Sequence, residues 1–378
     1  MEPRDQLLDQ PASAIESTEQ SQESTQAPSV VSQQEMEAVQ QLAVGLLAKV
    51  EQLPDGDLVG QIINTALNLL RDQTNRGDIK LINSALKELR YSLKVFAPYH
   101  NVRKVSIFGS ARTPADDPDY LQAVAFARGM AHAGWMVTTG AGGGIMAAGH
   151  GGAGAGASFG LAIRLPFEQT TNPYIANDPK LINFKYFFTR KLMFLRTSHA
   201  IVLFPGGFGT MDEGYEVLTL VQTGKAVPMP IVMLEHPGGD YWRTWEEQTK
   251  NHLLAHGFIG PDDLRLYKIT DSVAEAMHEI SHFYSNFHSV RYIGKNLALR
   301  LQHPPTVAQL QDITAHFSDI IVEGEFQVSG PLPAEHDEPV LAHLSRLVFA
   351  FNKRNFARLR RLIDYLNDLP TPEVADPA

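Results

Sequence analysis

A glycine-rich turn followed directly by acidic residues is the part of the chain best suited to chemistry. The turn covers residues 205–210 and reads PGGFGT. Its glycines allow the backbone to approach a ligand closely, and a helix starting there would direct free N–H groups and its positive dipole end at an anion. We therefore predict a phosphate site. Asp212, Glu213 and Glu216 come next. Because phosphate alone needs no carboxylates, we expect the site also to hold a sugar or to act on one. A turn required only for packing is the alternative.

Two more glycine turns follow predicted strands. Residues 109–112 (GSAR) follow a strand expected at 104–108, and residues 140–144 (GAGGG) follow one expected at 135–139. The second turn loosely resembles a dinucleotide fingerprint, but it follows the second strand instead of the first, and Glu168 lies in a loop beyond the third strand. Contact with phosphate or sugar through backbone amides is therefore preferred to hydride transfer. For residues 109–112 a plain strand–helix turn is the alternative. The candidate ligand contacts from these turns are Gly109, Ser110, Gly142, Gly143 and Gly144.

Two basic residues, Arg190 and Lys191, lie in a helix expected at 184–198, just before an apolar run at 200–204. Arginine offers a planar fork that fits phosphate or ribose oxygens, although periodicity alone favours a solvated helix face. The 14 histidines show no persuasive ligand spacing, so no metal site is expected. Cysteine is absent, which excludes disulfides and thiolate chemistry.

These residues require a scaffold in which strands and helices alternate. Such alternation, with glycines at the carboxyl ends of strands, predicts an α/β fold with a Rossmann-like, doubly wound parallel sheet. Ligands of such sheets lie in the crevice beyond those carboxyl ends, where we expect the three turns to meet. Further strands are expected at residues 158–165, 200–204 and 230–234. Further helices are expected at residues 120–133 and 210–222, and a helix of small residues is expected to follow the turn at 140–144 and to end at residue 155.

The remainder of the chain predicts flanking regions around this domain. Residues 1–40 hold eight acidic residues and one basic residue, so of the net charge of −10 only −3 belongs to the rest. This near-neutral body gives no reason to expect nucleic-acid binding. No signal-peptide or membrane-spanning pattern is visible, so a cytoplasmic protein is expected. The predicted divisions are a disordered acidic tail (1–33), a region of about three helices (34–100), the sheet domain (101–290) and a C-terminal α+β accessory module (291–378).

Within the C-terminal module the pattern is less regular. Pro304 and Pro305 precede a predicted short helix, residues 320–328 read as a strand, and apolar residues from 341 to 366 have the spacing of one long amphipathic helix. The basic residues expected on that helix are interpreted as a solvated face or an oligomer contact, with RNA binding as the alternative. They are Lys353, Arg354, Arg358, Arg360 and Arg361.

Taken together, these motifs resemble those of the LOG ("lonely guy") family. Residues 205–213, PGGFGTMDE, match its PGGxGTxxE motif, and residues 190–191 match its Arg-Lys pair. Residues 106–111 (SIFGSA) and 139–149 (TGAGGGIMAAG) resemble its other two ligand turns, and residues 165–175 (LPFEQTTNPYI) resemble its longer subgroup. The resemblance covers roughly residues 100–290 and suggests an extended bacterial form.

The resemblance implies a reaction. Family members are phosphoribohydrolases that cleave the N-glycosidic bond of nucleoside 5′-monophosphates to free base and ribose 5-phosphate, some acting on cytokinin nucleotides and others on ordinary purine or pyrimidine nucleotides. Many carry the label lysine decarboxylase, but no recognisable pyridoxal phosphate site is visible here. No cofactor is expected, and a homodimer or higher homo-oligomer is. A non-catalytic nucleotide-binding sensor or carrier on the same fold is the alternative.

The resemblance also implies roles for individual residues. Arg190 and Glu213 match the catalytic pair, and an oxocarbenium-like transition state suits a carboxylate. Lys191 and Glu168 are further substrate contacts, the latter to ribose or base. Gly214 departs from the larger apolar residue common at this position, which leaves base preference open. The 5′-phosphate is expected on Gly206, Gly207, Gly209 and Thr210.

Overall fold

The computed structural model describes residues 33–165 and 171–370. The chain divides into two compact units, Met1–Lys94 and Val95–Ala378. The acidic tail predicted at residues 1–33 lies almost wholly outside the described residues, and the boundaries predicted at residues 100 and 290 stay predictions. Within the described residues, no helix is long and apolar enough to cross a membrane.

The described part of the first unit, from residue 33, is built from helices, as predicted. They are α3 (Gln33–Val50), α4 (Gly56–Arg71) and α5 (Arg76–Phe96), the last of which runs across the boundary between the units. The first two form a helical hairpin, in which Gly60 of α4 faces Leu47 of α3. The predicted number of helices in this region is therefore confirmed for residues 33–96.

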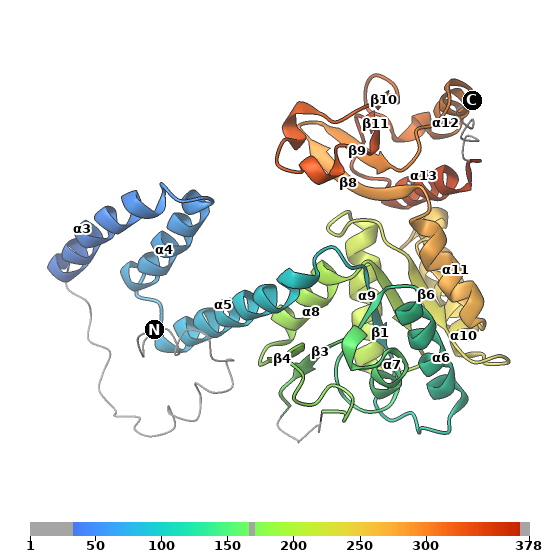
Figure 1. The fold of residues 1–378 in the computed structure, drawn as a ribbon, viewed down its shortest axis with the longest axis horizontal. Coiled ribbons are helices and arrows are strands. Elements are labelled where there is room, and N and C mark those ends of the chain that lie inside the picture. The colour runs from blue at the N-terminus through green and yellow to red at the C-terminus, as the bar shows by residue number, and fades with distance from the viewer. Residues whose placement is uncertain (1–32, 166–170, 371–378) are drawn as a thin grey trace, which may run out of the picture. The chain divides into compact units, whose positions relative to one another are not determined.

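The second unit contains a seven-stranded parallel sheet flanked by helices, which confirms the predicted doubly wound fold (Figure 1). The strand order is β4-β3-β2-β1-β5-β6-β7, so the direction of winding reverses between the neighbouring strands β1 and β5. The strands are β1 (Lys104–Phe108), β2 (Met136–Thr139), β3 (Ser158–Ile163), β4 (Leu181–Phe184), β5 (Ala200–Leu203), β6 (Ile231–Leu234) and β7 (Lys268–Thr270).

The central strands are buried along their whole length because both of their faces are covered. All residues of β1, β2, β5 and β6 are buried, which explains why they appear in the sequence as continuous runs instead of alternating ones. The connecting helices are α6 (Pro118–His132), α7 (Ile145–Ala153), α8 (Phe187–Thr197), α9 (Phe208–Gln222), α10 (Tyr241–Gln248) and α11 (Val273–Phe283).

Two strands at the edges of this sheet were missed. β4 and β7 are four and three residues long, and although β4 (LINF) is largely apolar, segments this short have no distinctive periodic pattern. As a result the helix expected from residue 184 was placed too early: Phe184 ends β4, and α8 begins at Phe187.

The C-terminal part forms a second, antiparallel sheet of order β10-β11-β9-β8. Its strands are β8 (Phe287–Ile293), β9 (Asn296–Leu301), β10 (Gln327–Ser329) and β11 (Ser345–Phe349), and its helices are α12 (Val307–Phe317) and α13 (Phe356–Asp368). The helix predicted after Pro305 is confirmed as α12, whose first turn has a capping box of Thr306 and Gln309. One apolar cluster runs through both sheets of the unit.

Three predictions for this part were wrong. Residues 341–366 do not form one helix, because β11 occupies 345–349 and α13 starts only at Phe356. Of the strand expected at 320–328, only its last two residues lie in β10, with one isolated bridge from Ile321. The basic residues do not form one solvated face: Lys353 and Arg354 precede α13, and the others pair with acids. Those pairs are Arg358–Asp319, Arg360–Glu279, Arg360–Asp364 and Arg361–Asp262.

Candidate active site

The three predicted ligand turns meet at the point where the sheet reverses its winding. The backbone N–H of Ser110, after β1, donates to the carbonyl of Pro205, after β5, at 3.1 Å. The carbonyl of Ser110 in turn accepts from the N–H of Ile145, which begins α7 after β2, at 3.0 Å. Open α/β sheets bind ligands at such a switch point. The predicted convergence of the turns is therefore present in the structure.

Glycine is needed in these turns for two different reasons. At Gly144 (φ 56°) and Gly206 the backbone lies too close to its neighbours for a side chain. A Cβ on Gly144 would lie 2.2 Å from the carbonyl oxygen of Ser110, and a Cβ on Gly206 would lie 2.2 Å from the hydroxyl oxygen of Thr210. At Gly207 and Gly209 a Cβ would meet nothing within 4 Å. The first two glycines therefore close the turns, whereas the second two leave open space in front of them.

The open space faces the first turn of α9. Gly207 is the N-cap, and its carbonyl accepts from the N–H groups of Thr210 and Met211. The N–H groups of Phe208 and Gly209 lie at the start of the helix, where backbone N–H groups have no partner within the helix. They are therefore available to an anion. The turn is also held from outside, because the Tyr241 hydroxyl donates to the carbonyl of Gly206 at 2.6 Å.

Arg190 and Glu213, which the motif match paired, face each other between α8 and α9. Nη2 of Arg190 donates to Oε1 of Glu213 at 3.4 Å, and the two side chains are only 13% and 6% exposed. Arg190 also borders the turn after β2, since a Cβ on Gly140 would lie 3.9 Å from its Nη1. The guanidinium packs near the rings of Phe187 and Phe194, and its Nε is buried without a hydrogen-bond partner.

Burial gives Glu213 an unusual proton affinity. Loss of water raises the pKa of its carboxyl to about 7, although the nearby charges of Lys191 and Arg190 oppose this shift. Burial also lowers the pKa of Arg190, against the opposing attraction of Glu213. A buried carboxyl that titrates near neutrality, beside a guanidinium and an open helix start, has the properties of a catalytic group.

Lys191 has a different environment from its neighbour. Its Nζ pairs with Asp212 at 2.7 Å and with Glu216 at 2.6 Å, both on α9. Burial lowers the pKa of Lys191, but the hydrogen bonds that its ammonium donates to these two carboxylates outweigh that effect and raise it. In this structure Lys191 joins α8 to α9 and so helps to fix the two helices that carry Arg190 and Glu213.

Of the remaining predicted site residues, all but Glu168 lie in the described part of the chain. Gly109 packs against Ile145, and Gly142 lies in the β2 turn, where its carbonyl accepts from the Asn172 side chain at 2.9 Å. Glu168 lies among residues 166–170, outside the described part of the chain. The sequence did not reveal the contacts of Tyr241 and Asn172, because each reaches a turn about 30 residues away. Tyr241 belongs to no motif, and Asn172 lies in the 165–175 segment without a role assigned to it.

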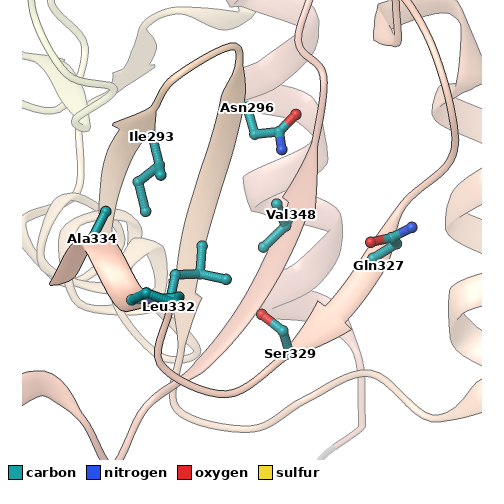
Figure 2. A pocket seen from close by; sticks show the side chains of 8 residues that line it. Ile293, Asn296, Gln327, Ser329, Leu332, Ala334 and Val348 are labelled. Carbon is teal, nitrogen blue, oxygen red and sulfur yellow. The ribbon is translucent and has the colours of Figure 1, made fainter.

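A hollow of about 380 Å³ lies elsewhere in this unit, on the small antiparallel sheet (Figure 2). Asn296, Gln327 and Ser329 line it together with aliphatic side chains such as Ile293 and Val348. No residue lining this hollow is ionisable, so it lacks a charged group or a general acid–base pair like that of Arg190 and Glu213. Among the described residues there is also no group of three or more histidine and acidic side chains that could hold a metal ion.

Comparison with known proteins supports the resemblance seen in the motifs. Residues 144–280 match the model of a family described as "Possible lysine decarboxylase", the label that many LOG proteins carry. This stretch begins in the β2 turn and contains Arg190 and Glu213. No curated protein matches the chain.

Several solved structures are similar to part of the chain. The protein TM1055 is 23% identical, with 48% of this chain and 99% of that chain covered and a TM-score of 0.34. The molybdenum cofactor binding protein from the phototrophic bacterium Rippkaea orientalis is 17% identical, with 48% and 94% covered and a TM-score of 0.34. The Moco carrier protein from Chlamydomonas reinhardtii is 19% identical, with 48% and 96% covered and a TM-score of 0.33.

Proposed function

We propose that this protein hydrolyses the N-glycosidic bond of a nucleoside 5′-monophosphate, of purine or cytokinin type, to free base and ribose 5-phosphate. One observation carries the proposal: a buried arginine–carboxyl pair, Arg190 and Glu213, borders the open first turn of α9 at the switch point of the sheet. The family match over residues 144–280 agrees with a nucleotide-related function.

The 5′-phosphate would lie at the start of α9. Amides around Gly207 and Gly209 have space in front of them, and the helix dipole favours an anion there. Thr210 is almost fully buried, and its hydroxyl lies beside Gly206, where a Cβ would approach it to 2.2 Å; in this proposal the hydroxyl completes the phosphate site. Such binding fixes the substrate at an end remote from the bond that breaks, which is how positioning contributes to rate.

The ribose would then lie beside the Arg190–Glu213 pair. As the bond from C1′ to the base nitrogen breaks, positive charge develops on C1′ and the ring oxygen. The ionised carboxylate of Glu213 stabilises that charge, and a water oxygen forms the new bond to C1′. One proton from that water goes to the departing base. Arg190 donates hydrogen bonds that hold the substrate and favour departure of the base. The reaction balances with water as the only second reactant.

The protonation state of Glu213 sets a condition on this mechanism. With a pKa of about 7, the carboxyl is about half ionised at neutral pH in the free protein, and only the ionised form can stabilise an oxocarbenium ion. Turnover should therefore increase as the pH rises through about 7.

We further propose that the protein acts as a homodimer or larger homo-oligomer. Large apolar side chains are exposed near the site, among them Phe187, Phe188 and Leu192 of α8, and Phe208 at the start of α9 is 97% exposed. A second copy that covered them would also close the site to water. Measuring the mass in solution for the native chain and for Phe208→Asp tests this, since a monomeric native chain would contradict it.

The test of the hydrolase proposal is direct. The purified protein is incubated with adenosine, guanosine, cytidine, uridine and isopentenyladenosine 5′-monophosphates, and free base and ribose 5-phosphate are assayed. Glu213→Gln is run in parallel. Release of both products that disappears in the variant supports the proposal and ranks the bases. Nucleotide binding without release would instead support the alternative, a non-catalytic sensor or carrier.

A further inference from the structure

We propose that Asn172 and His150 are positioning residues that fix the turn after β2, residues 140–144, in the shape needed for substrate binding. The inference rests on the proposed function, because that turn borders both Arg190 and the loop after β1. His150 lies just outside the 139–149 motif and Asn172 lies in the 165–175 segment, but neither was a candidate site residue, and neither is a hydrogen-bond or ion-pair partner of Arg190 or Glu213.

The turn needs external support because its backbone is in an unfavourable conformation. Ala141 has φ 64°, in the left-handed region that residues other than glycine seldom adopt, and it is 1% exposed. Such a conformation persists only where the surroundings hold it. Gly144, at the end of the same turn, also has a positive φ.

Asn172 supplies most of that support. Its backbone N–H donates to the carbonyl of Ala141 at 2.9 Å, and its side-chain Nδ2 donates to the carbonyl of Gly142 at 2.9 Å. Thr139 completes the set, because its hydroxyl accepts from the Ala141 N–H at 3.0 Å. Three successive backbone groups of the turn are therefore fixed by hydrogen bonds. Asn172 is 4% exposed, so water does not replace these bonds easily.

His150, fully buried on α7, fixes the orientation of the Asn172 side chain. Its Nε2 lies 2.9 Å from the carbonyl of Phe159, which can only accept, so Nε2 carries the proton. Nδ1 is then an acceptor. It lies 3.1 Å from Nδ2 and 3.3 Å from Oδ1 of Asn172, and of these two atoms only Nδ2 can donate to it. The two hydrogens of Nδ2 thus have one acceptor each, Nδ1 of His150 and the carbonyl of Gly142.

The neutral form of His150 is required by this arrangement. Burial lowers its pKa, although the hydrogen bonds to Phe159 and Asn172 and the charge of Asp178 oppose this. A rotated amide would turn Oδ1 of Asn172 towards the carbonyl of Gly142, where two acceptors would repel each other. The Gly142 carbonyl and the Nδ1 lone pair of neutral His150 therefore both favour the amide orientation in which Nδ2 faces them.

The experiment compares two substitutions of Asn172 with a control. Asn172→Ala removes the side-chain bond and keeps the backbone bond. Asn172→Asp keeps the shape but places a carboxylate against the carbonyl of Gly142. The control is Asn367→Ala, since Asn367 is a buried asparagine of α13 that bonds backbone groups away from the site, among them the carbonyl of Phe283.

For each variant, kcat/KM is measured with the best nucleotide, and nucleotide affinity and thermal unfolding are measured in parallel. We expect Asn172→Ala to lose about tenfold or more in kcat/KM and in affinity, because a small displacement of positioning groups is costly. Asn367→Ala should lower only the unfolding temperature. Equal kinetic effects in Asn172→Ala and Asn367→Ala would overturn the inference.

Asn172→Asp adds a readout that a purely structural role would not change. Its activity relative to the native chain should increase as the pH falls, because the protonated carboxyl can again donate to the carbonyl of Gly142. A constant ratio across pH would overturn the inference, including in the case where Asn172→Ala does not fold. If the native chain binds nucleotide without cleaving it, the hydrolase proposal fails and affinity alone decides the role of Asn172. If it does neither, both proposals fail.

Discussion

Replacing Glu213 with glutamine should make the protein more stable while removing its activity. The folded protein holds the Glu213 proton more tightly than the unfolded chain does, because burial raises the pKa from 4.5 to about 7. The folded state therefore binds more protons between these values, and stability must decrease as the pH rises from about 4.5 to about 7. Above pH 7 the full cost of the buried charge is present.

The size of the effect follows from the same two pKa values. At about 1.4 kcal/mol for each tenfold change in proton affinity, the difference corresponds to about 3 kcal/mol. This figure already includes the attraction of Arg190 and Lys191, since both contribute to the folded-state pKa. Glutamine has the shape of the protonated acid and cannot ionise. At about pH 8 the variant should gain about 3 kcal/mol, and at about pH 5 less than about 1 kcal/mol.

Thermal unfolding at both pH values measures this directly. For a domain of this size, the gain at about pH 8 corresponds to an increase of about 5 °C or more in unfolding temperature. Glu216→Gln is the control, since Glu216 lies on the same helix but is 36% exposed and paired with Lys191; it should not gain stability. A native chain as stable as Glu213→Gln at about pH 8, or a gain independent of pH, would refute the buried-charge argument. In the native chain, kcat/KM should rise with pH and level off above about 7.

Two further substitutions test contacts away from the site. Gly224→Ala should destabilise the protein by about 2–4 kcal/mol in denaturant unfolding, because its Cβ would lie 1.9 Å from the Phe356 ring at φ 69°. Gly257→Ala, with φ 72° but open space, should lose only about 1 kcal/mol, and equal losses would contradict the packing argument. Glu335→Gln should cost about 3–5 kcal/mol by leaving the buried Arg346 without its carboxylate. Although burial raises the pKa of Glu335, its hydrogen bonds lower it to about 2, so native stability should decrease as the pH falls from about 4.5 towards 2, a loss that the variant should not show.

The sheet could be predicted from the sequence because its central strands carry their own signal. The run at 200–204 is apolar on both faces and the run at 104–108 is mostly apolar, and a glycine-containing turn follows each of them, so the residue pattern and turn chemistry agree. The turns were placed correctly for the same reason. Edge strands such as β4 bury fewer side chains, and a short segment of that kind has no distinctive pattern.

The C-terminal error has a physical cause of the same kind. In β11 the core-facing residues Leu347 and Phe349 are buried, but so are Arg346 and Val348 on the other face. A strand covered on both sides loses its alternation, and its apolar residues can then also fit helical spacing. The covering group is a buried ion cluster in which Glu335 joins Arg346 to Arg300. Sequence reasoning cannot recognise such a cluster, since its members are up to 46 positions apart.

The geometry of the candidate catalytic pair depends on contacts of this long-range type. Glu213 lies near the start of α9, and Lys191 holds that end through Asp212 and Glu216. The other end of α9 is followed by Gly224, against which the Phe356 ring packs from 132 residues further along the chain. A helix of 15 residues transmits a displacement along its length as a nearly rigid rod of about 22 Å. The motif therefore points to the candidate catalytic residues, but the contacts that fix their positions lie in parts of the chain that no motif describes.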